Sequence, residues 1–275
     1  MRVILVPVAD RPECARALGT AFDLGERLKA SVSGCHIRPH RYSEVSMSTA
    51  FADAAWRRKS TKKAPAAAKA MYRRLAEEHD YEFVRRPRAA PAALWSERVG
   101  SPQILMSING PVCDLIVVSR PVKSGGIADM FLKSALLEST KPVLILPQRS
   151  RKSIGRRVVV FWNQSAEAGR AVSASIPVLQ HAEEVTIVTA GPEDRPGPKS
   201  AQVVGYLKHW GIKAVRVSTK GRQVEQELLG AYKELKGDLV VAGAYSRSRW
   251  REKVFGGTTE FLLRKARMPV FTQHH

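Results

Sequence analysis

The chain repeats a long pattern of its own sequence, and this internal repeat constrains the fold more than any other feature. The matched pairs of segments are 2–8 with 156–162, 114–119 with 238–243, and 134–146 with 261–273. The matches keep their order along the chain, so the sequence predicts a tandem of two related domains. The offsets between partners are 154, 124 and 127 residues, which indicates about 30 additional residues in the first copy.

The predicted domains cover residues 1–148 and 156–275. A chain of 275 residues gives each copy enough length for a buried core. The joint between the copies is polar, basic and bounded by Pro147 and Gly155. Because the joint is short, we expect the two domains to be packed together. The additional material of the first copy falls at about residues 39–70.

Short Val/Ile/Leu runs alternate with segments of helical period in both copies. The strands expected in the first copy are 2–8, 31–37, 81–85, 114–118 and 143–146, and those in the second are 157–162, 184–189, 213–217, 238–242 and 270–273. Helices are expected at 12–28, 165–180, 198–210, 222–236 and 257–266. This alternation predicts the α/β class, with two tandem, Rossmann-like open-sheet domains. Each would be a mainly five-stranded parallel sheet with helices on both faces.

The net charge is the most unusual property of the composition. The 45 Lys and Arg residues outnumber the 25 Asp and Glu residues, which gives a formal charge of +20. Such a surface attracts phosphates and other polyanions weakly and in a salt-dependent manner. No zinc-finger, RNA-binding-strand or helix-turn-helix pattern indicates specific recognition of nucleic acid.

The basic stretch from Ala50 to Met71 belongs to the additional material of the first copy. It includes Trp56-Arg-Arg-Lys-Ser-Thr-Lys-Lys63. One interpretation is a solvated helical arm that lengthens the second helix. The alternative is a helix that binds a polyanion or a membrane surface.

The sequence also indicates the compartment. No apolar run reaches the roughly 20 residues that span a membrane, and no signal-peptide pattern precedes the first strand. A cytoplasmic protein is therefore expected. Cys14, Cys35 and Cys113 are far apart and form no Cys-x-x-Cys pair, so we expect buried reduced thiols. The sequence predicts no metal site and no catalytic motif.

A glycine-containing loop follows the fourth strand of the second copy. It begins Gly243-Ala-Tyr-Ser246 and, after nine intervening residues, continues with Gly256-Gly-Thr-Thr259. A helix that starts near Gly257 would direct free N–H groups and the positive end of its dipole toward an anion. Open parallel sheets bind their ligands at the carboxyl ends of the strands, which is where this loop lies. The alternative interpretation is an ordinary strand-to-helix crossover that uses glycine for its turns.

In these motifs both copies resemble the universal stress protein family, and the similarity covers essentially the whole chain except the inserted arm. Nucleotide-binding members carry Gly-x-x-Gly, nine residues, then Gly-Ser or Gly-Thr. Here Ser246 replaces the second glycine, and Gly257 stands where Ser or Thr is usual. Asn163 occupies the place of an acidic residue that recognises the nucleoside. The resemblance implies a stress-responsive, non-catalytic protein that binds ATP or AMP in its second domain.

The residues that the resemblance assigns to this nucleotide site lie at the ends of three strands and in the glycine-containing loop. They are Phe161, Trp162 and Asn163 beside the nucleoside, Val188 and Ala242 at the base, and Gly243, Ser246, Gly256, Gly257, Thr258 and Thr259 around the ribose and phosphates.

The first copy lacks the glycines of the loop. It offers Ser119, Val122 and either Asp129 or Leu132 at their places, and Ala9 stands where the acidic residue would fall. The first domain is therefore expected to be a structural partner without a nucleotide pocket. We expect the domains to form a pseudo-dimer through strands 143–146 and 270–273, and a homo-oligomer is compatible with this reading. The rival hypothesis is a ligand-free scaffold that presents its basic surface to a protein or nucleic acid.

Overall fold

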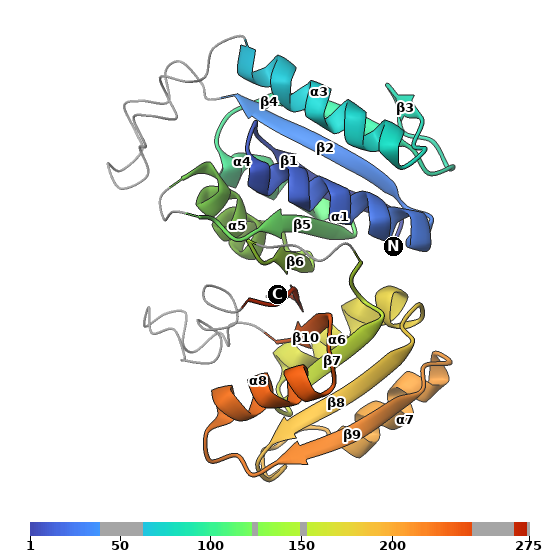
Figure 1. Ribbon diagram of the computed structural model, residues 1–275, viewed down its shortest axis with the longest axis vertical. Helices are drawn as coiled ribbons and strands as arrows, with labels where there is room; N and C mark the ends of the chain where they lie inside the picture. Colours follow the sequence, from blue (N-terminus) through green and yellow to red (C-terminus); the bar gives the residue numbers. More distant parts are fainter. Residues whose placement is uncertain (39–62, 123–125, 149–152, 244–266, 274–275) are drawn as a thin grey trace. The chain divides into compact units, whose positions relative to one another are not determined.

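The computed structural model describes residues 1–38, 63–122, 126–148, 153–243 and 267–273. The chain divides into two compact units, Met1–Ser150 and Arg151–His275. Figure 1 shows strands and helices alternating along the chain in both units. Each unit is described below by itself.

The first unit contains a parallel sheet of six strands in the order β3-β4-β2-β1-β5-β6. Its strands are β1 (Val3–Val8), β2 (Ser31–Arg38), β3 (Phe83–Val84), β4 (Ala93–Val99), β5 (Leu115–Ser119) and β6 (Val143–Leu146). Its helices are α1 (Pro12–Leu28), α3 (Lys63–Glu78), α4 (Pro102–Asn109) and α5 (Ile127–Glu138), with a 3-10 turn at Gly110–Val112.

The second unit contains a parallel sheet of five strands in the order β11-β10-β7-β8-β9. Its strands are β7 (Arg157–Trp162), β8 (Glu184–Ala190), β9 (Ala214–Thr219), β10 (Leu239–Ala242) and β11 (Val270–Thr272). Its described helices are α6 (Ala166–Leu179), α7 (Ser200–His209) and α8 (Val224–Glu234).

The direction of the strand order reverses once in each unit. It reverses between β1 and β5 in the first unit and between β7 and β10 in the second. Because crossovers between parallel strands are right-handed, connections that run in opposite directions place their helices on opposite faces. The predicted α/β class, with open parallel sheets covered on both faces, is confirmed.

Local sequence explains why the elements form where they do. Helix α1 begins at Pro12, a residue that suits a first helical position, and ends at Lys29, whose φ of 51° is left-handed. Its buried positions, from Cys14 through Leu18 to Phe22, recur at helical spacing. The central strands β1, β5, β7 and β10 are continuously buried over almost their whole length, as strands covered on both faces must be.

Several elements of the first unit had no predicted range, among them β4, α4 and α5. The expected strand at 81–85 shrinks to the two residues of β3, and the longer strand β4 follows it at 93–99. The second half of β4 is charged and exposed, so it lacks the apolar run that signals a strand. Helix α4 was missed although Ser101 caps it, accepting a bond from the N–H of Ile104 at 3.4 Å. The predicted helix 257–266 lies outside the described residues.

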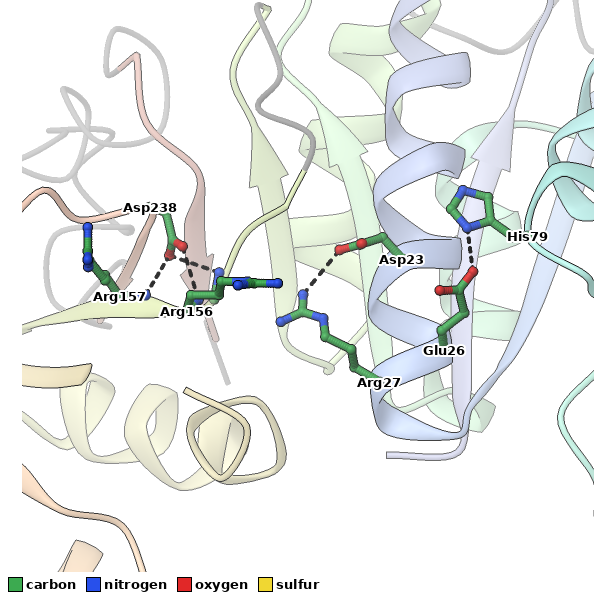
Figure 2. A network of polar contacts seen from close by, with 8 residues as sticks. Asp23, Glu26, Arg27, His79, Arg156, Arg157 and Asp238 are labelled. Atoms are coloured by element: carbon green, nitrogen blue, oxygen red, sulfur yellow. Dashed lines mark hydrogen bonds and ion pairs between the residues drawn. The ribbon is translucent and has the colours of Figure 1, made fainter. Parts of the chain in front are cut away.

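An aspartate fastens the start of the first strand in both units. The Asp114 carboxylate accepts bonds from the N–H groups of Arg2 and Val3 at 2.6 and 3.0 Å. Its repeat counterpart Asp238 accepts bonds from Gly155, Arg156 and Arg157 at 2.9, 3.0 and 3.2 Å. Figure 2 shows the Asp238 carboxylate beside Arg156 and Arg157. The sequence repeat is therefore also a repeat of hydrogen bonds.

Helix α3 is fixed against α1 rather than extending free into solvent. Tyr72 is completely buried, and its hydroxyl donates to the Val32 carbonyl at 2.7 Å. At the other end of α3, His79 stacks on Phe22 and its Nδ1 lies 2.5 Å from Glu26 Oε1 (Figure 2). The part of the predicted basic arm before residue 63 lies outside the described residues.

Candidate functional site

The reversal of strand order in the second unit brings two chain segments together at the carboxyl edge of the sheet. Ala242 of β10 pairs in register with Phe161 of β7. The residues that follow, Trp162 and Asn163 on one strand and Gly243 on the other, therefore leave the sheet side by side. Open parallel sheets bind their ligands in the crevice at this position.

Asn163 is exposed, and its side chain organises the start of α6. Its Oδ1 accepts bonds from the backbone N–H of Ser165 at 3.2 Å and from the Ser165 hydroxyl at 2.7 Å. Ser165 Oγ in turn accepts a bond from the N–H of Ala168 at 3.1 Å and so caps the helix. Because the Asn163 oxygen is engaged in this turn, the group it offers to a ligand is the Nδ2 donor.

Gly243 lies against the first turn of α6. A Cβ at this position would lie 2.5 Å from the Ala168 nitrogen and 2.8 Å from the Glu167 carbonyl carbon. Such distances exclude any side chain while the backbone keeps this position. The close approach of β10 to α6 thus requires glycine here, whether or not a ligand is bound.

Three of the predicted nucleoside-binding residues belong to the hydrophobic core on one face of the sheet. Phe161, Val188 and Ala242 pack in one cluster with Leu228 and Tyr232 of α8. Their exposed fractions are 6%, 0% and 4%. In this structure the three side chains therefore pack in the core against α8.

Trp162 belongs to a clamp between the loops that follow β7 and β8. Its Nε1 donates to the Pro198 carbonyl at 2.9 Å. The buried Gln164 joins the same loops through Nε2, which donates to the carbonyls of Arg195 and Gly197 at 2.9 and 3.2 Å, and through Oε1, which accepts from the Arg195 N–H at 3.1 Å. The 191–199 loop is therefore held against the segment that contains Asn163.

Sequence reasoning did not identify Gln164 or the loop clamp. A glutamine beside an Asn-x-Ser helix start carries no motif, and the signal that was available is the Pro- and Gly-rich composition of residues 191–198. The other predicted site residues, Ser246, Gly256, Gly257, Thr258 and Thr259, lie outside the described residues.

At the corresponding edge of the first unit, the described residues hydrogen-bond and pack against one another. The buried Ser119 hydroxyl donates to the Glu13 carbonyl at 2.8 Å, at the place that Gly243 and Glu167 occupy in the second unit. The cavity between Pro7, Cys14, Ser119 and Phe131 measures about 10 Å³. That volume holds about one water molecule.

Buried charged groups belong to the segments that follow β5. Arg120 is only 3% exposed, and burial lowers its pKa to about 10. Asp129, in the first turn of α5, is buried and pairs with Lys133 at 2.6 Å. Of the other residues at the predicted glycine positions, Leu132 is buried and Val122 is exposed.

The three cysteines are buried and unpaired, as the sequence predicted. Burial raises the pKa of Cys14 and of Cys113 to about 12, which keeps both thiols protonated at neutral pH. Within the described ranges, no group of three His, Cys, Asp or Glu side chains is arranged to hold a metal ion. The described helices include none with the length and apolarity to span a bilayer.

Comparison with known proteins assigns the second unit to a family. Residues 156–272 match the model of the Universal stress protein family. No curated protein sequence matches the chain. The family that the sequence predicted is thereby confirmed for residues 156–272.

Solved structures extend the fold relationship to both units. A universal stress protein from Archaeoglobus fulgidus superimposes with a TM-score of 0.69 at 16% identity, covering 99% of this chain and 96% of that one. A putative universal stress protein from Pseudomonas aeruginosa gives a TM-score of 0.58 at 15% identity, covering 100% and 93%. A functionally unknown protein from the same species gives 0.57 at 15% identity, covering 100% and 92%. The tandem two-domain arrangement fits these matches along the whole chain.

Proposed function

We propose that the protein is a non-catalytic stress-response protein of the cytoplasm whose second unit binds an adenine nucleotide, ATP or AMP. The observation that carries the proposal is the strand reversal between β7 and β10, which sets the exposed Asn163 beside Gly243. The match of residues 156–272 to the universal stress protein family supports the same half of the chain.

The ligand would lie over the carboxyl edge of the second sheet. Asn163 Nδ2 would donate to an oxygen of the nucleoside. Phe161, Val188 and Ala242 would form the apolar floor, and the loop that begins at Gly243 would receive the phosphates. The bond from Ser119 to Glu13 at the corresponding edge of the first unit supports binding in the second unit alone.

The decisive experiment uses calorimetry with ATP and AMP on two variants, one in each unit, at positions of the family's glycine motif. Gly256→Val puts a side chain where backbone N–H groups would approach phosphate oxygens, so we expect it to abolish binding. Ser119→Val alters the equivalent edge of the first unit, and we expect unchanged affinity. Circular dichroism of both variants controls for folding.

The chief alternative is a ligand-free scaffold that presents a basic surface. The net charge of +20 favours it, as does the absence of a carboxylate at Asn163. Mass spectrometry of small molecules released from freshly purified protein separates the two hypotheses. Wild-type protein that carries no nucleotide and gives no heat with ATP or AMP would establish the scaffold in place of the binding protein.

A further inference from the structure

The two sheets end differently on the side away from the strand reversal. In the first unit, β3 lies outside β4, with Phe83 beside Ala93 and Val84 beside Leu94 in parallel register. In the second unit, β9 ends the sheet, and the described residues place no strand beyond it. Figure 1 shows β3 and β9 at these positions.

The registers make β4 and β9 equivalent strands. Ala93 pairs with Val32 one residue into β2, and Ala214 pairs with Val185 one residue into β8. A strand placed in the second unit as β3 is placed in the first would therefore lie beside Ala214 and Val215.

Burial shows what the missing strand leaves uncovered. Ala93 is completely buried in the first unit, whereas its counterpart Ala214 is half-buried. Val215 is 62% exposed, whereas Val217, two residues further along the same face of β9, packs against the core cluster that includes Leu228 and Tyr232 of α8. The edge combines unpaired backbone groups with an uncovered apolar side chain, which is the arrangement that receives an added strand.

Charge selects what this edge can accept. The chain from Arg195 to Val224 contains seven Lys and Arg residues and no Asp or Glu. Arg216 lies on β9, Lys220 directly follows it, and both are exposed. Pairing of β9 with β9 of a second copy would bring these cations against one another, and like charges across a strand pair are destabilising.

We propose that β9 is a docking edge for an extended acidic segment of a partner protein, which adds to the sheet as β3 does in the first unit. Backbone hydrogen bonds to the edge would hold the segment, its apolar side chain would cover Val215, and its carboxylates would lie near Arg216 and Lys220. The proposal does not depend on nucleotide binding in the second unit.

The test uses the full-length chain and a fluorescent peptide with the sequence Glu-Phe-Val-Glu-Val-Glu-Val, which keeps the Phe-Val pair of β3. Anisotropy should report saturable binding that weakens with salt. The double variant Arg216→Glu/Lys220→Glu should weaken binding about tenfold, because one peptide Glu lies opposite Arg216 and the next lies diagonal to Lys220, and both pairs become unfavourable. The matched control Lys233→Glu/Lys236→Glu changes the net charge equally, at exposed positions in the last turn of α8 and just after it, and should weaken binding less than about twofold.

Two further measurements separate strand addition from charge attraction. A peptide methylated on alternate backbone nitrogens keeps its charge but loses half its donors, so it should not bind wild-type protein. Hydrogen exchange should show slower amides in β9 when the unmodified peptide is bound.

Several outcomes would overturn the proposal. They are absent binding, equal losses in the two double variants, and equal binding of the methylated peptide. Tighter binding and β9 protection by an oligodeoxythymidylate of equal charge would assign the edge to nucleic acid instead.

Discussion

Two glycines after neighbouring strands of the second unit are in contact. Gly191 follows β8 with a φ of 84°, and Gly221 follows β9 with a φ of 74°. A Cβ on Gly221 would lie 2.5 Å from the Gly191 Cα and 2.7 Å from its nitrogen. The turn after β9 thus needs glycine both for its conformation and for its space.

We predict opposite effects of two Gly→Ala substitutions in this unit. Gly221→Ala should lower the free energy of unfolding by about 1–3 kcal/mol, because the left-handed conformation and the Gly191 contact both oppose a side chain. Gly230 lies inside α8 with open space around its missing Cβ. Gly230→Ala should therefore raise the free energy of unfolding by about 0.5–1 kcal/mol. Urea unfolding of both variants measures the difference, and equal destabilisation would contradict it.

Single residues at the candidate site were only partly predictable. The sequence predicted Gly243 as a glycine that lets a ligand approach the backbone closely. The structure adds a packing reason, the contact with α6, which the spacing of the motif does not reveal. Gln164 gave no signal, because its partners Arg195 and Gly197 lie about 30 residues away and meet it only after β7 and β8 pair. Sequence pattern indicates which edge holds the site, and tertiary contacts decide what each side chain does there.

At the scale of elements, a carboxylate in the first turn of helix α8 caps the turn that precedes the helix. Glu227 accepts bonds from the N–H groups of Gly221, Arg222 and Gln223 at 2.6, 2.8 and 2.9 Å. These bonds, led by the one from Gln223, and the Thr219 side chain lower the Glu227 pKa to about 2. The carboxylate thus satisfies donors that the turn before α8 would otherwise leave open.

The lowered pKa predicts how the contribution of Glu227 depends on pH. A depressed folded-state pKa stabilises the fold above the ordinary glutamate value, and this stability is lost as pH falls through about 4.5 toward 2. The unfolding temperature of Glu227→Gln should therefore lie below that of wild type at pH 6 and converge with it near pH 2. Glu225→Gln, in the same helical turn, is the control for charge. A wild-type-to-variant difference that stays constant with pH would contradict this account.

Elements with a continuous apolar or helical pattern were predicted well, and those stabilised by their neighbours were not. Helix α1 begins and ends at the predicted residues, and β7 and β6 match their predicted ranges. Strand β4 was not predicted, because its second half is charged and exposed and has no apolar face. Backbone pairing with β2 stabilises it instead.

At the scale of the whole molecule, the repeat predicts that the two units pair through β6 and β11. Two similar sheets can cover their exposed edge groups in this way. Hydrogen exchange on monomeric full-length protein tests the pairing, because a strand bonded on both sides protects every amide. We expect slow exchange at all residues of Val143–Leu146 and Val270–Thr272. Alternating fast and slow amides would identify both strands as free edges.

The tandem organisation was readable from the sequence because the repeated segments are the buried central strands and their fastening aspartates. Asp114 and Asp238 stand at the same place in both units and form equivalent bonds. What distinguishes the units was less visible, since the bond from Ser119 to Glu13 and the added strand β3 depend on contacts between distant segments.

The loop clamp at Gln164 has a thermodynamic consequence for whatever occupies the second unit. The segments on either side of it are ordered by bonds among Gln164, Arg195 and Gly197 before any ligand arrives. A ligand that contacts these segments would not have to order them on binding, because their conformational entropy has already been lost on folding. Little binding free energy would therefore be spent on ordering the chain. We therefore expect ligands to associate with these segments without a slow rearrangement of the chain. Differences in affinity among ligands should then arise in their dissociation rates.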